Sequence, residues 1–257
     1  MTTTEAPRRP AARRSALDHE TAMQLAEHEY GRYLDLLRTL GPADWDRPTD
    51  CPAWDVRAMA AHNLGMADMA ASLRETARQN EKAGRRGGVF IDALTGLQVE
   101  ERADLTPEQV VARYAEAAPR AARGRRRRPA LLRRAVLPGT QDVGGVAERW
   151  TYGYLVDTIL TRDTWMHRID TARATDRELV LTPDHDGLIV ADVVAEWAGR
   201  HGATCTLTLT GPAGGRWTYG SARPGSDPHL ELDAIEFCRT VSRRAQGRGL
   251  LDVEVPF

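Results

Sequence analysis

The sequence has little cysteine and no long apolar run, and each shortage excludes a class of protein. Its three cysteines, Cys51, Cys205 and Cys238, are an odd number and form no CxxC pair. This usage argues against a disulfide framework and for a reducing cytoplasm. No apolar run approaches the roughly 18 residues that span a bilayer, and the N-terminal segment lacks the apolar core of a secretory signal. We therefore expect a cytoplasmic protein without a membrane segment.

An excess of charge of either sign is also missing. The 257 residues include 35 basic and 36 acidic side chains, for a net charge of −1, so a global field that attracts polyanions is not expected. Lys82 is the only lysine, and almost all positive charge is arginine. We attribute that bias to GC-rich coding, as in an actinobacterium. The apolar fraction of 42% suffices for a core, and the length allows one large domain or two modest ones.

One segment departs from this balance, because residues 120–134 contain eight arginines. The run is a strong local positive patch. It has no aromatic residues interleaved, which single-stranded nucleic acids need for stacking. We expect a solvated loop or helix face. Nucleic-acid association is the alternative, and the salt dependence of any DNA binding would test it.

The first two thirds of the chain are predicted to be helical. Residues 1–15 have no apolar periodicity and are expected to be a disordered tail. Four long helices are expected, with Ser15, Asp55 and Thr106 as caps of the first three. Pro119 should end or kink the third helix. The expected helices cover residues 15–41, 56–82, 106–119 and 146–174, within a domain at 16–182.

The character of the sequence changes after Pro183. Residues 184–200 have the apolar spacing of a helix, and CTLTLTG (205–211) alternates as a strand does. A tight turn, GPAGG, leads to a partner strand at 216–220. Further strands are expected at 229–233 and in the last eight residues, with a helix at 234–245 between them. The expected fold class is α+β, with a helical bundle followed by a small α+β domain at 183–257.

The sharpest local feature is the segment DTWMHRID within the fourth expected helix. Asp163, His167 and Asp170 are four and three residues apart, so they share one helix face. Such a carboxylate and imidazole can form a salt bridge, or supply two of the three protein ligands of an open zinc site. His62, in an otherwise apolar run, is the candidate third ligand. The remaining histidines are expected at the surface or at element ends: His19, His28, His185, His201 and His229.

Several segments together resemble one family in the right order. TDCPAWDVRAMAAHNLG (49–65) resembles the T-x-C-x-x-W-x-V-x5-H entry to the second helix of the mycothiol-dependent maleylpyruvate isomerase family, part of the DinB/YfiT-like superfamily. RDTWMHRIDTARAT (162–175) is similar to that family's fourth-helix E-x-W-x-H-x-x-D segment. Residues 234–257 look like the tail of its small α/β domain, which is related to sterol-carrier-like modules. The resemblance covers roughly residues 15–257.

This resemblance implies a four-helix bundle that holds one divalent metal, usually zinc. Carried across, the ligands are His62, Asp163 and His167, with Asp163 standing where the family usually has Glu. Asp is one methylene shorter, so the metal would lie closer to the fourth helix or bind less tightly. Aspartate is itself a known zinc ligand. The implied cofactor is a low-molecular-weight thiol, mycothiol if the source makes it.

The resemblance also implies an arginine from the small domain that faces the metal and helps to hold an anionic thiol or substrate. The segment SRRAQGRG offers Arg243, Arg244 and Arg248, of which Arg244 aligns best. Guanidinium suits this task because it binds carboxylates bidentately. A solvated helix-end arginine is the alternative. Asp170 could orient His167, or form an ordinary ion pair with Arg168, Arg173 or another surface arginine.

We therefore expect a metal-dependent and thiol-dependent isomerase or S-transferase, active as a monomer or weak dimer on a small electrophile, with His62, Asp163, His167 and Arg244 as catalytic residues. Arg243 and Arg244 are the expected cofactor-binding residues. The alternative is a ligand-binding or regulatory protein of the same fold with a weakened metal site. Cys51 is expected to be a small buried residue. Core or cleft-wall positions are expected for Trp45, Trp54, Trp150 and Trp165.

Overall fold

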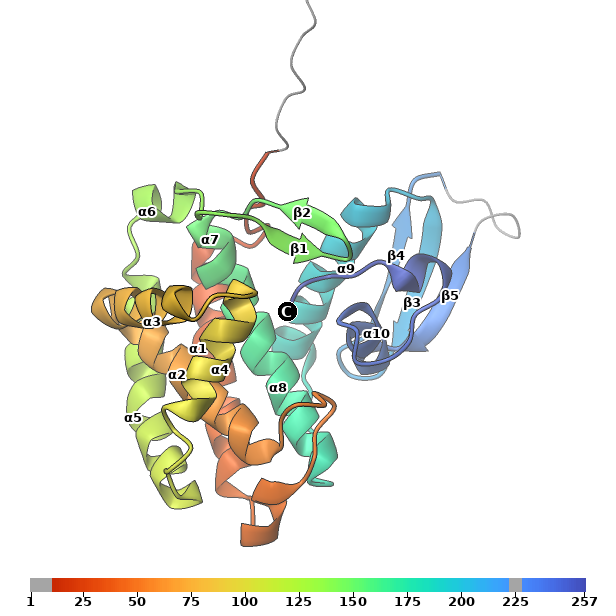
Figure 1. Ribbon diagram of the computed structural model, residues 1–257. Helices are drawn as coiled ribbons and strands as arrows, with labels where there is room; N and C mark the ends of the chain where they lie inside the picture. Colours follow the sequence, from red (N-terminus) through yellow and green to blue (C-terminus); the bar gives the residue numbers. More distant parts are fainter. Residues whose placement is uncertain (1–10, 222–227) are drawn as a thin grey trace, which may run out of the picture.

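The computed structural model describes residues 11–221 and 228–257, and four long helices form its centre. They are α1 (His19–Arg38), α2 (Val56–Ala71), α5 (Pro107–Arg126) and α8 (Leu160–Ala174). Contacts join α2 to α5, α5 to α1, α1 to α8 and α8 to α2, which closes a ring of four helices (Figure 1). The predicted bundle and the α+β fold class are confirmed.

Two of the three predicted helix caps are correct. The Asp55 carboxylate accepts from the backbone N–H of Ala58, and the Thr106 hydroxyl accepts from that of Gln109. The prediction for Ser15 is wrong, because Asp18 caps α1 by accepting from Thr21. A carboxylate at this position satisfies a free N–H and also interacts favourably with the helix dipole.

The predicted helix at 56–82 is two helices in the structure. Ser72 has extended backbone angles, and its hydroxyl accepts from the N–H of Glu75 at the start of α3 (Leu73–Arg86). Serine favours such caps because its side chain competes for backbone hydrogen bonds. A further helix that the sequence analysis did not assign, α4 (Phe90–Glu100), packs against both α2 and α3.

Pro119 does not end α5, which continues through it to Arg126. The proline ring is exposed, whereas Ala117, Ala118, Ala121 and Ala122 around it are buried. Packing of this alanine face offsets the cost of a proline in a helix interior, about 3 kcal/mol for the missing hydrogen bond and the ring clash together. The arginine-rich run therefore spans the end of α5 and the short helix α6 (Ala130–Arg134).

The fourth expected helix begins later than predicted. Strands β1 (Gln141–Val143) and β2 (Val146–Glu148) form a hairpin, because Gly144 and Gly145 both have positive φ. Two such residues give the turn that matches strand twist. The helix then begins with α7 (Tyr152–Tyr154) and a π turn at Leu155–Ile159, which lead into α8.

The C-terminal region follows a π turn at Pro183–Gly187. Helix α9 (Leu188–His201) and the three strands β3 (Cys205–Thr210), β4 (Gly215–Tyr219) and β5 (His229–Asp233) agree with prediction. The sheet order is β4-β3-β5, with β4 antiparallel and β5 parallel to β3. Helix α10 (Ala234–Val241) is shorter than predicted. The predicted final strand is wrong, because a 3-10 turn occupies Gly249–Asp252 and no strand follows.

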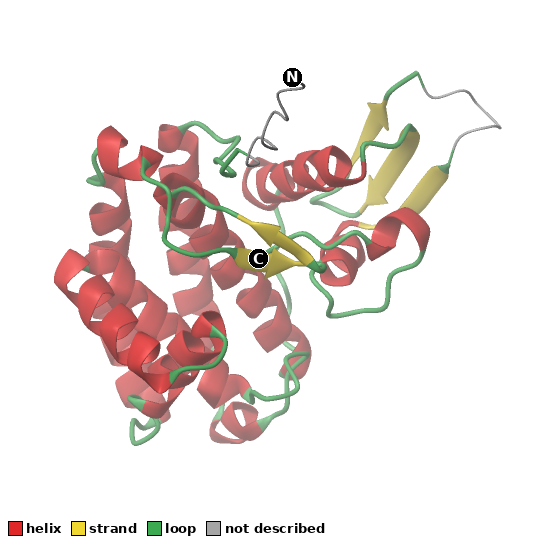
Figure 2. Cartoon of the chain, turned by 45° about the horizontal axis from the view of Figure 1, so that its top comes forward, coloured by secondary structure: helices red, strands yellow, loops and turns green. Residues whose placement is uncertain are grey.

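Helix α8 lies between the rest of the bundle and the C-terminal region (Figures 1 and 2). Its Trp165, Met166 and Ile169 belong to the apolar core of α9, β3 and α10, whereas Leu160 belongs to the bundle core. The helix that carries Asp163 and His167 is thus buried on two sides. This burial fixes where its polar face can point.

Two expectations from composition concern the chain as a whole. Of the predicted tail at 1–15, residues 1–10 lie outside the described residues. Arg13 forms a β-bridge with Trp150 and an ion pair with Glu148. In residues 11–221 and 228–257, none of the helices combines the length and apolar character that a membrane span needs.

Candidate metal centre

Three side chains from two bundle helices converge on one point. His62 comes from the middle of α2, and Asp163 and His167 lie one turn apart on α8. His62 Nε2 is 3.3 Å from Asp163 Oδ2, and His167 Nε2 is 3.3 Å from Asp163 Oδ1. Potential ligand atoms of the three residues all lie within 4.8 Å of one another. The structure therefore brings together the three residues that the sequence singled out.

His62 is held from behind by a residue of α4. Its Nδ1 lies 2.8 Å from Gln98 Oε1, so the imidazole donates its Nδ1 hydrogen to an amide carbonyl. The Trp54 ring lies against the histidines, with its centroid 4.8 Å from that of His62 and 5.7 Å from that of His167. Trp54 thus forms a wall of the site, while Trp45 and Trp165 are buried in the core.

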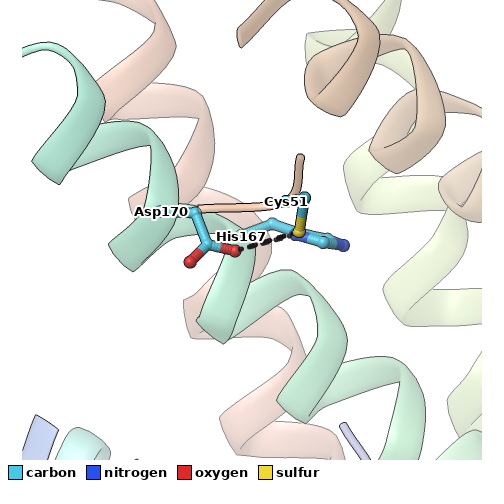
Figure 3. Close-up of side chains that lie close together, drawn as sticks. All are labelled: Cys51, His167 and Asp170. Carbon is cyan, nitrogen blue, oxygen red and sulfur yellow. Dashed lines mark hydrogen bonds and ion pairs between the residues drawn. The ribbon is translucent and has the colours of Figure 1, made fainter. Parts of the chain in front are cut away.

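His167 is held by a carboxylate. Its Nδ1 lies 3.3 Å from Oδ2 of Asp170, which is fully buried one turn along α8. Arg244 from the C-terminal region donates from Nε to both oxygens of Asp170 at 2.9 Å. The Cys51 sulfur lies beside His167 and Asp170, 3.8 Å from Asp170 Oδ2 (Figure 3). It also accepts from Arg244 Nη2 at 3.7 Å.

The charges of these residues depend on one another. Burial by itself would raise the pKa of the Asp163 carboxyl, but the charges of His167 and His62 hold that pKa well below its usual range. Burial would likewise lower the pKa of His167, but the charge of Asp163 raises it well above its usual value, helped by hydrogen bonds to Asp163 and Asp170. Any cation that binds His167 Nε2 must therefore displace a proton.

The donor set fits a divalent metal ion. Both imidazoles have Nδ1 hydrogen-bonded to an oxygen, so Nε2 of each is the atom left to face Asp163. Metal-ligating histidines usually show this arrangement, because the outer hydrogen bond fixes the ring and its tautomer. Two imidazole nitrogens and one carboxylate suit zinc and leave a coordination position open. The Asp163 side chain is 16% exposed, so solvent reaches this carboxylate.

The arginines suggested by the sequence lie in different places. Arg244 reaches Asp170 beside the histidines, whereas Arg243 forms ion pairs with Asp252 and Glu254. The two alternatives for Asp170 are both realised, because it bonds His167 and pairs with Arg244. The arginines named for it in sequence pair elsewhere: Arg168 with Glu29 and Asp186, and Arg173 with Asp50 and Glu236.

Sequence reasoning missed Gln98 entirely. It lies in α4, whose 11 residues were left unassigned, and a lone glutamine carries no spacing signal. The expectation that Cys51 is buried is also wrong, because its side chain is partly exposed next to Asp170 and Arg244. Cys205 and Cys238 are buried, and all three cysteines are free.

A second buried acidic and histidine group lies between α1, α8 and the turn before α9. His185, expected at the surface or as a cap, is buried and bonds Glu29 at 2.7 Å. Arg168 lies 2.6 Å from both Glu29 and Asp186, and Arg32 also pairs with Asp186. Positive side chains already neutralise these carboxylates, so the group is a structural ion-pair network.

Half of the arginines in the arginine-rich run bond to other parts of the chain. Arg125 is fully buried and bonds Tyr30, Thr161 and the Val156 carbonyl. Arg126 pairs with Glu20 and Glu27, Arg133 pairs with Asp157, and Arg128 donates to the Ala70 carbonyl. Four of the eight arginines thus have internal partners, which reduces the charge available to a polyanion.

Two surface hollows of about 480 and 490 Å³ have no site residue in their walls. One is lined by residues of α3, α4 and the turn after α4, including Lys82 and Glu101. The other is lined by the end of α8 and the residues after it, including Arg173 and Leu179. Neither hollow is lined by His62, Asp163, His167 or Arg244.

Comparison with known proteins bears on the fold and the family. No curated protein matches the sequence. Two crystal structures, of the mycothiol-dependent maleylpyruvate isomerase and of a histidine-to-alanine mutant of it, are 16% and 15% identical to this chain. Each comparison covers 89% of this chain and 90% of the other, with a TM-score of 0.56, and shows a shared fold. The family model for the mycothiol maleylpyruvate isomerase N-terminal domain matches residues 26–172, more than half of the chain. The chain belongs to that family.

Proposed function

We propose that this protein is a thiol-dependent isomerase or S-transferase that holds a divalent metal ion, Zn²⁺ as first candidate, between His62, Asp163 and His167. The observation that carries the proposal is the convergence of two Nε2 atoms on one carboxylate, with both Nδ1 atoms bonded elsewhere. Family membership supports a thiol cofactor, which is mycothiol in the solved relatives.

The ion, when bound, acts as a Lewis acid and lowers the pKa of a thiol or water at its open position. The chain's own residues prepare that position. Asp163 and the two imidazoles fix it at the α2–α8 contact, and Trp54 covers the histidine rings on one side. Addition of a thiolate to an activated double bond, bond rotation and elimination would give cis–trans isomerisation. Addition alone, or displacement of a leaving group, would give S-transfer.

The position of Arg244 is the reason to propose a substrate or thiol that bears a carboxylate. Its Nε hydrogen is used by Asp170, and its side chain is 12% exposed. Guanidinium has five N–H donors. In Arg244 the Nε hydrogen goes to Asp170 and one Nη2 hydrogen goes to Cys51 Sγ, so three donors on the terminal nitrogens remain for an anionic group. Arg244 therefore has two tasks in this proposal: it orients Asp170 and receives an anionic group.

Metal analysis of the purified protein, combined with a screen of low-molecular-weight thiols against small unsaturated acids, tests the proposal. Arg244→Ala should keep the metal and raise KM by about 10–100-fold, since a hydrogen bond to a charged group contributes roughly 1.5–3 kcal/mol. Arg243→Ala is the matched control, because its partners are Asp252 and Glu254. A metal-free protein that binds small ligands without turnover would favour the ligand-binding alternative.

A further inference from the structure

A chain of buried amide groups leads from His62 away from the metal centre. Gln98 accepts the His62 Nδ1 hydrogen and donates from Nε2 to Gln79 Oε1 at 2.8 Å. Gln79 in turn donates to the Gly65 carbonyl at 3.1 Å and to Glu75 Oε1 at 2.9 Å. Both glutamines are completely buried, so water does not compete for these bonds. The chain connects α2, α3 and α4.

The far end of this chain sets the direction of every bond in it. A backbone carbonyl and a carboxylate can only accept, so the Gln79 NH₂ group must face Gly65 and Glu75. A hydrogen bond from Arg78 holds the pKa of the Glu75 carboxyl below its usual value, which keeps this acceptor ionised. The Gln79 carbonyl must then accept from Gln98. The Gln98 carbonyl is left to accept from His62.

We propose that Gln98 is a positioning residue for the metal centre, which holds His62 in the Nδ1–H tautomer with Nε2 directed at Asp163. This inference rests on the proposed function. Gln79 and Glu75 act through Gln98, because they prevent its amide from turning over. If the Gln98 amide were reversed, its NH₂ group would face Nδ1, and His62 would have to carry its hydrogen on Nε2. That nitrogen could not then bind a metal ion.

Close packing of α2 against α4 at Gly65 allows the contact between Gln98 and His62. A Cβ atom added at Gly65 would lie 2.6 Å from Gln98 Cβ and 2.7 Å from its Cγ. These atoms belong to the root of the side chain and cannot swing aside easily. Glycine at position 65 thus lets Gln98 approach α2 closely enough to reach His62, one turn away on the same helix. A neutral amide also avoids burying a second charge behind the site.

Two variants and one spectroscopic measurement test the proposal. Methionine in Gln98→Met has a similar length but lacks the oxygen that accepts from His62 Nδ1, and glutamate in Gln98→Glu keeps an oxygen there. Zn²⁺ affinity is measured by competition with a chelator, and the His62 tautomer by ¹⁵N NMR. Gln98→Met should weaken Zn²⁺ binding by about 10–100-fold, as loss of an outer partner usually does. Gln98→Glu keeps the acceptor for His62 but loses the donor to Gln79, so it should weaken Zn²⁺ binding less than Gln98→Met does. Gln24→Met, an exposed glutamine on α1, is the control and should change nothing.

The outcomes separate this inference from the proposed function. Failure of the wild-type protein to bind Zn²⁺ overturns the metal-dependent function. A hydrogen on His62 Nδ1 would still support the role of Gln98 in holding that tautomer. Normal Zn²⁺ affinity in Gln98→Met overturns the inference and leaves the function intact. If Gln98→Met does not fold, the wild-type spectrum decides: a hydrogen on Nδ1 supports the proposal, and a hydrogen on Nε2 overturns it.

Discussion

The two histidines of the site are held in opposite ways. The His62 Nδ1 hydrogen is bonded to the amide of Gln98 on α4, which is bonded in turn to the amide of Gln79 on α3, and both amides are fully buried. The His167 Nδ1 hydrogen is bonded to the carboxylate of Asp170, which pairs with Arg244 from the C-terminal region. One support is therefore complete within the bundle, and the other requires the C-terminal region to be in place. The difference gives the C-terminal region a direct role in shaping the candidate metal centre.

The groups bonded to the two histidines also differ in charge: those behind His62 are uncharged, and those behind His167 are charged. Amides fix the His62 ring without adding charge near the ion. The Asp170 carboxylate is paired with Arg244, and its hydrogen bond to His167 adds to the charge of Asp163 in raising the pKa of that imidazole. Cys51 and Arg244 lie on this second side, and both are partly accessible. We expect thiol and substrate to approach from the charged side, and the amide side to be purely architectural.

The largest effect should come from removing either histidine. His62→Ala and His167→Ala should each lower Zn²⁺ affinity by more than the roughly 100-fold that marks loss of an outer partner, because a direct ligand disappears. Chelator competition measures this. His28→Ala, an exposed histidine of α1, is the control. If either variant kept its full metal content and thiol-dependent turnover, the metal–thiol mechanism would be wrong.

A smaller effect is expected when the charged support is neutralised. Asp170→Asn keeps an oxygen for the His167 Nδ1 hydrogen but leaves Arg244 without its ion-pair partner. The free energy of unfolding should fall by about 1.5–3 kcal/mol, the size of a hydrogen bond to a charged group, and chemical denaturation measures it. The double variant with Arg244→Met should recover part of this loss. No recovery would mean that the two residues do not interact energetically.

The smallest expected change concerns the amide side, through two glycines on neighbouring helices. Gly65→Ala should crowd Gln98, lower stability by about 1–3 kcal/mol and weaken Zn²⁺ binding. Gly96→Ala on α4 meets no atom within 4 Å and should raise stability by about 0.5–1 kcal/mol without touching Zn²⁺ affinity. Thermal unfolding with and without Zn²⁺ compares the pair. Equal behaviour of the two variants would show that close α2–α4 packing does not matter for the site.

Residue order alone predicted the features that depend on neighbours within a few residues. The spacing of Asp163, His167 and Asp170 placed them on one helix face, and the caps Asp55 and Thr106 marked where α2 and α5 begin. The alternation in 205–211 predicted β3. His62 was assigned from its apolar surroundings and from the family resemblance. Helical and strand periodicity are local, so they are written directly in residue order.

The groups that hydrogen-bond to those site residues from behind follow from the packing of distant segments. Gln98 reaches His62 across 36 residues, and Arg244 reaches Asp170 across 74. The helix expected at 56–82 is interrupted at Ser72, because that serine caps α3. The helix expected to end at Pro119 continues, because the alanine face around the proline is buried. No spacing rule predicts such pairs, since they depend on how α4 packs on α2 and how the C-terminal region packs on α8. Periodicity says which face a residue occupies, and packing alone says what that face meets.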